Sequence, residues 1–248
     1  MQNYKKIETH CHSNPVSGCS QIPAGQLAPL YKAQGFDTVI LTNHYADLMP
    51  TLGSTPRERI DTYLKNYEIE RKSGKEIGVN VLLGAEVFVP HPKAEGNELK
   101  WYHGDFLLFG LKPSLLYEYY PLHYFSQKRL FEFCCAYDIL LIQAHPWRTA
   151  HNCLPADLTQ VHGLEVYNPH IVCPNDTENS VRDAAENHLL MTAGSDCHST
   201  NEAGNAYMMI PREVETIEDF RDYLKTGEAI LGSKEKGIFR PEDVLKES

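Results

Sequence analysis

Two histidines lie one residue apart near the start of the chain, in the stretch ETHCHS at residues 8–13. His10 ends the short alternating segment YKKIETH, which predicts a β-strand, and His12 follows just behind it. Because strand side chains alternate between faces, His10 and His12 project to the same side, whereas Cys11 points away. Two imidazoles on one side of a strand end can reach one cation, so a metal site is the first candidate.

Similar polar residues follow other apolar, β-branched segments. They are His44, Glu86, His145, Glu165 with Asn168, and Asp196 with His198. The corresponding predicted strands are residues 5–10, 37–44, 80–87, 105–111, 138–145, 163–168 and 189–196, with residues 206–210 as an eighth candidate. In a β/α barrel the carboxyl ends of the strands meet on one face, where active sites lie. We therefore expect these side chains to gather in one site.

The residue types narrow the chemistry of that site. Imidazole and carboxylate ligands together suit zinc, manganese or iron, whereas Ca²⁺ calls for oxygen ligands alone. The candidate ligands exceed the needs of one ion, and a carboxylate can bridge two ions, so we expect a multinuclear site. Two such ions can generate a hydroxide near neutral pH and stabilise the entering and leaving oxygens of a displacement at phosphorus.

The elements that must position these residues alternate between strands and helices. Helices are predicted at residues 23–35, 55–74, 123–138, 175–188 and 216–227. This order is typical of βα units and predicts an α/β fold with a parallel sheet, and seven or eight units are enough to close a barrel. We expect one domain over residues 1–248, with long loops at residues 91–100 and 145–163. The second helix should begin near Pro56 and end before Gly74.

The strand-end motifs also resemble those of a known family. THCHS, TNH, GAE, QAHP, GLEVYN and GSDCHS, in this order over roughly residues 7–200, look like the PHP (polymerase and histidinol phosphatase) family. The resemblance implies a distorted (β/α)7 TIM-like barrel, two or three divalent metal ions (zinc, manganese or iron) and hydrolysis of phosphoesters.

Residue roles carry over from this resemblance. Those assigned to a first metal are His10, His12, Glu86 and Asp196, with Glu86 bridging to a second. His145 matches a ligand of the second metal, and His44 and His198 match ligands of the third. Arg148, in HPWR, resembles a basic residue that holds a phosphate oxygen, which suits the fork of a guanidinium.

Three departures from the family pattern matter. The segment after the first strand, SNPVSGCS, lacks the usual further ligand of the third metal, and only Cys19 could substitute for it. The fourth strand reads HGDFLLFG, where either His103 or Asp105 could take the role of the usual histidine. Asn43 replaces an acidic residue at the second strand. The metal count is therefore two or three.

Two further residues are candidates for supporting roles. Glu165 could fix the tautomer of a metal-binding histidine or be a polar residue of the barrel interior. His170, in YNPH, could protonate a leaving group.

The composition limits the partners. A formal net charge of −10 over 248 residues argues against a nucleic-acid or membrane surface, because both need clustered Lys and Arg. No apolar run is long enough to span a bilayer and the start is polar, so the expected location is the cytoplasm. Seven cysteines without framework spacing fit reduced thiols.

The sequence is compatible with three functions. The favoured one is a metal-dependent phosphoesterase that uses a metal-bridging hydroxide on a small phosphorylated substrate, with a monoester favoured. The second is an amidohydrolase-type enzyme that cleaves a C–N bond, although Lys112 follows its strand too late to match a fourth-strand carbamate ligand. The third is a non-catalytic metal-binding module.

Overall fold

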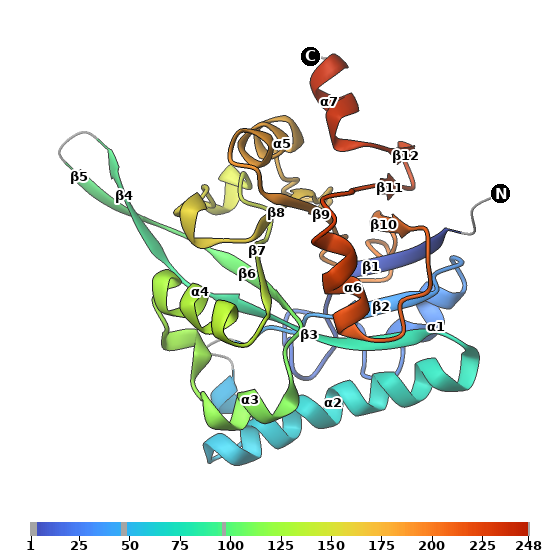
Figure 1. Ribbon diagram of the computed structural model, residues 1–248. Coiled ribbons are helices and arrows are strands. Elements are labelled where there is room, and N and C mark those ends of the chain that lie inside the picture. The colour runs from blue at the N-terminus through green and yellow to red at the C-terminus, as the bar shows by residue number, and fades with distance from the viewer. Residues whose placement is uncertain (1–3, 46–48, 96–97, 248) are drawn as a thin grey trace.

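The computed structural model describes residues 4–45, 49–95 and 98–247. Its centre is a ten-stranded sheet in the order β12-β11-β10-β1-β2-β3-β6-β7-β8-β9 (Figure 1). The strands are β1 (Lys5–Cys11), β2 (Thr38–Leu41), β3 (Asn80–Phe88), β6 (Asp105–Phe109), β7 (Leu140–Gln143), β8 (Gly163–Tyr167), β9 (Leu190–Ala193), β10 (Ala206–Ile210), β11 (Leu231–Ser233) and β12 (Gly237–Phe239).

The sheet curls until β9 comes back to β1. The Thr9 hydroxyl donates to the carbonyl of Ala193 over 2.8 Å, and Cys11 forms a parallel bridge with Cys197 beyond the end of β9. Strands β1, β2 and β3 are parallel to one another, as are β7, β8 and β9. The predicted α/β fold with the strand ends on one face is thus present.

The prediction of an all-parallel sheet is wrong at β6. This strand runs antiparallel to both β3 and β7. The cause lies in the connection from β3, which contains no helix but a hairpin of β4 (His91–Glu95) and β5 (Glu98–Tyr102). Without a crossover helix the chain returns along its neighbour in the opposite direction. The same hairpin, which projects from the body in Figure 1, replaces the loop expected at residues 91–100.

The predicted eighth strand exists but does not close a barrel. Residues 206–210 form β10, which pairs antiparallel with the outer edge of β1, Lys5 lying opposite Ile210. Strands β11 and β12 continue the sheet beyond β10. The segment therefore extends the sheet beyond β1 with antiparallel strands instead of completing a parallel ring.

Within the described residues the helices are α1 (Leu27–Lys32), α2 (Pro56–Ile77), α3 (Pro113–Glu118), α4 (Gln127–Ala136), α5 (Thr177–Glu186), α6 (Ile217–Leu224) and α7 (Pro241–Glu247). Five of them match predicted helices, whereas α3 and α7 were not predicted. The predicted loop at residues 145–163 contains two short 3-10 turns, Thr149–His151 and Leu158–Gln160. None of the described helices combines the length and apolar character needed to cross a membrane.

Helix α2 begins as predicted but ends later. Thr55 caps it in a capping box with Glu58, and Pro56 is the first helical residue. The helix continues through Gly74 and ends at Gly78, whose φ of 72° favours glycine. Gly74 serves close packing instead, because a Cβ there would lie 2.6 Å from the carbonyl oxygen of Val79.

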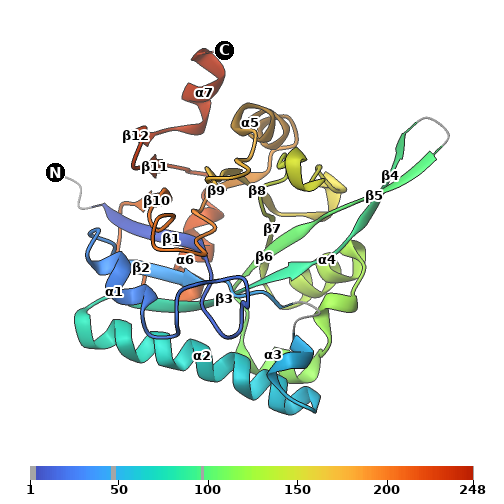
Figure 2. The same ribbon diagram turned by 180° about the vertical axis from the view of Figure 1, so that it is seen from behind.

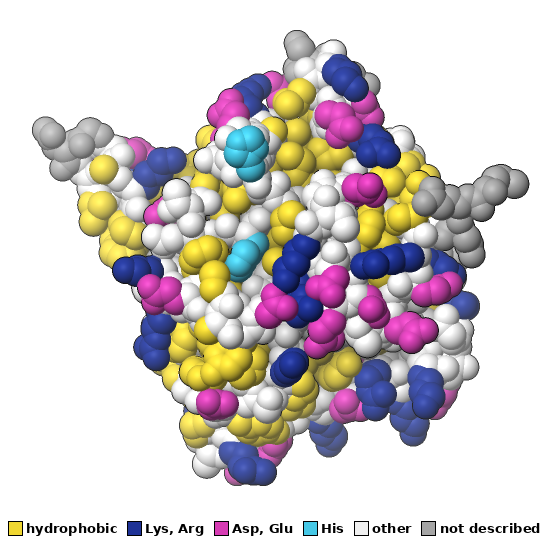
Figure 3. Space-filling view, in the orientation of Figure 1, with side chains coloured by type: hydrophobic (Ala, Val, Ile, Leu, Met, Phe, Trp, Pro, Cys, Tyr) yellow, Lys and Arg dark blue, Asp and Glu magenta, His cyan; other side chains and the backbone are white. Residues whose placement is uncertain are grey.

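The central strands are buried because helices cover the outside of the curled sheet. Phe106 and Phe109 of β6 are fully buried, and Phe109 packs edge-on against Phe220 of α6 with ring centroids 5.2 Å apart. In Figure 2, α2 runs below β1, β2 and β3, and the segment between β1 and α1 crosses in front of the sheet. On the face seen in Figure 3, acidic and basic side chains are interspersed.

A buried acid on α2 predicts a pH dependence of stability. Burial raises the pKa of Glu70 from 4.5 to about 7, and the nearby backbone N–H groups of residues 25–28 offset only part of this effect. The folded protein therefore holds a proton that the unfolded chain releases. Between pH 4.5 and 7 the free energy of unfolding should fall by up to about 3 kcal/mol through this group.

Chemical denaturation of the wild type and Glu70→Gln at pH 4.5, 6 and 8 measures this contribution. The stability of the wild type relative to the variant should decline as the pH rises. Glu68→Gln, at an exposed position of the same helix, is the matched control. If the free energy of unfolding changed with pH by the same amount in the wild type and in Glu70→Gln, the prediction would be wrong.

Candidate metal centre

The curled sheet brings eight ligand-type side chains to the same end. His10 lies near the end of β1 and His12 follows it, and Glu86 and Asp105 belong to β3 and β6. The others follow β2, β7 and β9; they are His44, His145, Asp196 and His198. Every one of them belongs to at least one group of neighbouring His, Cys, Asp or Glu side chains whose ligand atoms lie within 4.8 Å of one another. Residues up to 188 positions apart in sequence thus form a single cluster.

Two buried carboxylates form the middle of this cluster. His10 Nε2 lies 3.3 Å from Glu86 Oε1 and 3.3 Å from Asp196 Oδ1. His12 Nε2 lies 3.2 Å from the same Asp196 oxygen and 3.5 Å from Glu86 Oε2. His44 Nδ1 approaches Glu86 Oε2 to 2.7 Å. Glu86 and Asp196 therefore face imidazole nitrogens from two or more strands.

A second part of the cluster surrounds His145. Its Nε2 is 3.6 Å from Glu86 Oε1, 3.9 Å from Asp196 Oδ2 and 4.0 Å from Asp105 Oδ2. The buried Cys153 thiol completes a group with His145 and Asp105. Glu86 lies between this part and the first, in a position from which one carboxylate can reach two cations.

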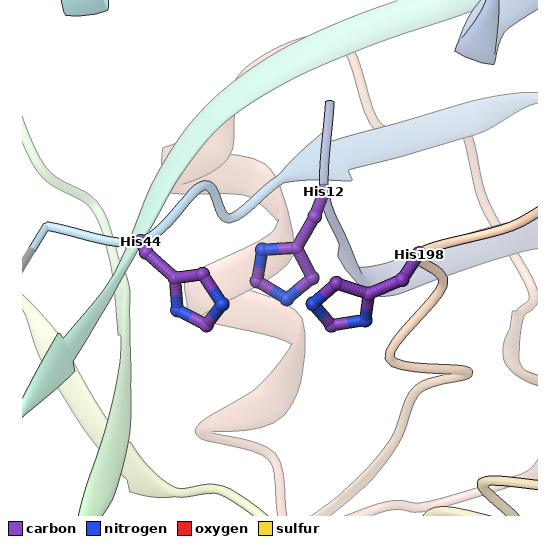
Figure 4. A group of neighbouring side chains, drawn as sticks. All are labelled: His12, His44 and His198. Carbon is purple, nitrogen blue, oxygen red and sulfur yellow. The ribbon is translucent and has the colours of Figure 1, made fainter. Parts of the chain in front are cut away.

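A third part consists of three imidazoles. The ring of His12 stacks against those of His44 and His198, with centroids 4.3 Å apart in both cases. Figure 4 shows His12 between the other two rings, with the ring nitrogens of the three side chains pointing into the same region. The neighbouring His198 and His44 lower the pKa of the Cys19 thiol to about 6, against the opposing effect of burial.

Hydrogen bonds fix the orientation of several imidazoles. Glu165 Oε1 accepts from His10 Nδ1 over 3.0 Å, and the carbonyl of Asp196 accepts from His198 Nδ1 over 2.9 Å. The Ser17 hydroxyl donates to Asn43 Oδ1, so His12 Nδ1, 3.2 Å away, is the donor to Ser17 Oγ. In each ring Nδ1 carries the proton, and the lone pair is left on Nε2. This is the arrangement in which a histidine binds a metal.

Glu165 also connects the histidines to Arg148. Its Oε2 accepts from the backbone N–H of His145 over 3.1 Å and from Asn168 Nδ2 over 2.7 Å. Asn168 Oδ1 accepts from Arg148 Nη2 over 2.7 Å, and Arg148 Nη1 pairs with Asp196 Oδ2 over 2.7 Å. The Arg148 side chain, expected near phosphate, is thus buried beside the cluster.

Glu8 holds the backbone at Asp196, which has a strained φ of 52°. The Glu8 carboxylate is fully buried and accepts from the backbone N–H of Ser195 over 3.0 Å and from its hydroxyl over 2.6 Å. It also accepts from the Tyr31 hydroxyl over 2.8 Å. These bonds link β1 to the turn after β9 and set the direction of the Asp196 side chain.

The buried atoms at the centre fit metal ions. His10 Nε2, His12 Nε2 and Glu86 Oε2 are buried without a hydrogen-bond partner among the described residues. Lone pairs on Nε2 that face carboxylate oxygens repel one another unless a cation lies between them. Ligand atoms about 2.1 Å from one cation, at angles of about 90–109°, lie about 3.0–3.4 Å apart. The separations of 3.2–3.5 Å between these nitrogens and oxygens agree with that spacing.

The charges of the cluster are strongly coupled. Burial alone would raise the pKa of Glu86, but the imidazoles of His44 and His10 outweigh it and hold the pKa well below its usual value. Burial is likewise outweighed at Asp196, whose pKa is lowered by His10, His12 and Arg148. Burial and the neighbouring His198 and His44 lower the pKa of His12 well below its usual value. The cluster therefore presents ionised carboxylates beside neutral His12.

The structure does not bring His103 to the cluster. His103 is exposed before the start of β6 and its ring packs edge-on against Phe88. Of the two candidates at β6, it is Asp105 that reaches the cluster, with its Oδ2 4.0 Å from His145 Nε2. Lys112 is exposed at the N-cap of α3.

His170 lies at the rim of the third part. Its Nε2 is 3.5 Å from Glu202 Oε1, and its ring centroid is 6.5 Å from that of His198. The Nδ1 atom accepts from the backbone N–H groups of Val172 and Cys173 over 3.3 and 3.4 Å. The proton of a neutral His170 is therefore on Nε2, which faces the cluster.

Sequence reasoning missed Glu8 and Ser17. Glu8 stands two residues before His10 and shares its side of the strand pattern, so alternation offered a signal for it. Ser17 has no such signal, because only the folding of the loop after β1 brings its hydroxyl to His12 and Asn43. Asn43, at the position of the family's acidic residue, is bound to Ser13, Ser17 and Asn66.

Comparison with known proteins extends these observations. Residues 175–229, which include Asp196 and His198, match the family model PHP_C, described as PHP-associated. None of the curated proteins is significantly similar to the chain. A two-domain protein from Bacteroides vulgatus containing a predicted PHP-like metal-dependent phosphoesterase aligns with a TM-score of 0.65 and 15% identity, covering 98% of this chain and 68% of that one.

Two other solved structures share the fold. PsfC from Pseudomonas syringae aligns with a TM-score of 0.61 and 18% identity over 98% of this chain and 96% of its own. An amidohydrolase from Chromobacterium violaceum, solved with bound sulfate and no metal, aligns with a TM-score of 0.52 and 13% identity over 96% and 99%. At these identities the solved structures establish the fold alone. The family-model match at residues 175–229 confirms the resemblance to the PHP family that the strand-end motifs indicated.

Proposed function

We propose that this protein is a metal-dependent phosphoesterase. The observation that carries the proposal is the central cluster, where buried imidazole nitrogens without partners face two buried carboxylates at distances that suit shared cations. The PHP-associated match and the fold shared with a predicted metal-dependent phosphoesterase support it.

Each ligand-type residue has a place in the proposal. His10, His12, Glu86 and Asp196 would hold one ion, and Glu86 would also reach a second beside His145. Asp105, and not His103, would serve that second ion, because only Asp105 reaches His145. His44 and His198 would hold a third. Bound zinc, manganese or iron ions would supply Lewis acidity and a water of lowered pKa.

The other residues act on the substrate and on the ligands. Glu165 keeps the lone pair of His10 on Nε2 by accepting the proton of Nδ1. The Arg148 guanidinium lies beside Asp196 and can neutralise charge on a phosphoryl group. The Nε2–H of His170 faces the cluster from its rim and can be donated to a departing alcohol oxygen.

We infer that the substrate is a small phosphate monoester. Arg148 is buried and anchored to Asn168, so its charge lies deep in the cluster. A terminal phosphoryl group can enter such a site, whereas the phosphorus of a diester carries substituents on both sides. The amidohydrolase alternative is weakened by the exposed position of Lys112 and stands as an outcome of the test.

Metal removal is expected to abolish hydrolysis. The test measures the metal content of the protein together with its hydrolysis of a phosphomonoester, a phosphodiester and a panel of amides. Each measurement is made before chelation, after chelation, and after zinc, manganese or iron is added back. Monoester hydrolysis should disappear with the metal and return with one of these ions. Turnover of amides and of neither ester would refute the proposal, and bound metal without any turnover would indicate a non-catalytic module.

A further inference from the structure

The segment after β7 carries His145 and folds back towards the start of β6. Arg148 N–H donates to the carbonyl of His145 over 3.1 Å, and Cys153 N–H donates to the carbonyl of Arg148 over 3.2 Å. This segment is the yellow stretch between β7 and β8 in Figure 1. Its turns bring Cys153 alongside His103, with which it forms a parallel bridge two residues before Asp105. Backbone contacts therefore fix the position of Cys153 relative to both β6 and β7.

Three side chains from these elements meet at one point. Ala144 N–H donates to the carbonyl of Asp105 over 2.8 Å, which ties the start of β6 to the residue before His145. One ligand atom from each of Asp105, His145 and Cys153 lies within 4.8 Å of the other two. The thiol of Cys153, a residue that is 3% exposed, makes one long contact among the described residues, at 3.8 Å from the carbonyl oxygen of His151. Its sulfur atom is therefore not engaged in a strong bond.

The imidazole of His145 gives a second, independent indication of a cation at this place. His145 is 3% exposed, and its Nδ1 has no hydrogen-bond partner within the described part of the chain. Its Nε2 lies 3.6, 3.9 and 4.0 Å from oxygens of Glu86, Asp196 and Asp105, which is longer than a hydrogen bond. A buried imidazole surrounded by carboxylates but bonded to none of them is accounted for by a cation between the groups.

We propose that Cys153 is a thiolate ligand of the metal ion held by His145 and Asp105. The ion displaces the thiol proton to solvent, and a sulfur–metal bond takes the place of the S–H bond. Sulfur makes this position softer than the centre formed by His10, His12 and two carboxylates, so it should favour zinc, iron(II) or cobalt(II) over manganese. The inference rests on the proposed function in that it requires a second ion beside His145.

Cobalt(II) reports a sulfur ligand directly. The metal-free wild type, titrated with cobalt(II), should develop a sulfur-to-cobalt charge-transfer band in the near ultraviolet together with ligand-field bands in the visible. Cys153→Ser should lose the charge-transfer band and keep the ligand-field bands of the ions at the other positions. Cys134→Ser, at a similarly buried cysteine of α4, is the matched control and should retain both.

Metal preference provides a second readout. Competition with a chelator measures the affinities of the wild type and the variants for zinc and for manganese. Cys153→Ser should bind one zinc ion more than about tenfold more weakly, because even a group that only orients a ligand contributes about that much. Its affinity for manganese should change less. Cys153→Ala, which removes the sulfur without burying a hydroxyl, should give the same result, and circular dichroism shows whether each variant is folded.

The outcomes separate this inference from the proposed function. A folded Cys153→Ser or Cys153→Ala protein that binds cobalt with the charge-transfer band of the wild type would overturn the role of Cys153 and leave the phosphoesterase proposal standing. Unchanged preference for zinc over manganese in both variants would do the same. Absence of any metal binding by the wild type would overturn both.

Discussion

Asp196→Asn is expected to strip metal from the centre and to lower phosphoester hydrolysis by more than about 100-fold. Loss of a group that only orients a metal ligand lowers metal affinity or activity by about 10–100-fold. Because Asp196 is itself a proposed ligand, its loss should cost more. Its Oδ1 faces both His10 and His12, so an amide at this position puts a weaker ligand where two imidazoles converge.

The choice of asparagine keeps the backbone. Asp196 has a φ of 52°, a conformation that asparagine tolerates well. The variant does remove the charged partner of the buried Arg148, so His10→Ala is the second variant, because it leaves the Arg148–Asp196 pair in place. Asp222→Asn, at an exposed ion pair with Arg221, is the control.

Metal content by elemental analysis, far-ultraviolet circular dichroism and monoester turnover are measured for all three variants. Asp196→Asn and His10→Ala should both be folded, depleted of metal and inactive, whereas Asp222→Asn should behave as the wild type. A folded His10→Ala protein with full activity and no bound metal would falsify the proposed centre.

Arg148→Met is expected to lower the turnover number by about 10²–10³-fold while the metal content stays close to that of the wild type. Removal of one preorganised donor to a developing charge costs about this much in other hydrolases. Methionine retains much of the apolar volume but supplies no charge. Because Arg148 pairs with Asp196 Oδ2, whereas His10 and His12 face Oδ1, its loss should affect the substrate more than the ligands.

Arg148→Lys and Arg182→Met sharpen this test. Lysine keeps the charge but not the fork that bonds Asp196 and Asn168 together, so Arg148→Lys should be intermediate in turnover. Arg182, at an exposed helical pair with Glu178, is the matched control and should show no change. If Arg148→Met lost metal but its turnover per bound metal stayed unchanged, Arg148 would act only on the metal ligands and the prediction would be wrong.

The candidate site could be predicted from local patterns because strand geometry determines it. A strand end followed by His or Asp places the side chain at the carboxyl edge, and this edge is shared by the strands that carry His10, His44, His145 and Asp196. The choice between His103 and Asp105 could not be made in this way. It depends on the residue at which β6 begins, and that residue is set by pairing with β3 and β7.

The sequence by itself determined the α/β fold class, the order of the central strands and most of the ligand-type residues, because apolar runs and alternation are local properties. Only the tertiary structure decided the reversed direction of β6, the hairpin in place of a loop, and the contacts of Glu8 and Ser17. These features depend on hydrogen bonds between segments far apart in the chain, such as those from Ser195 to Glu8 and from Gln21 to His198. No pattern within either segment encodes such a contact.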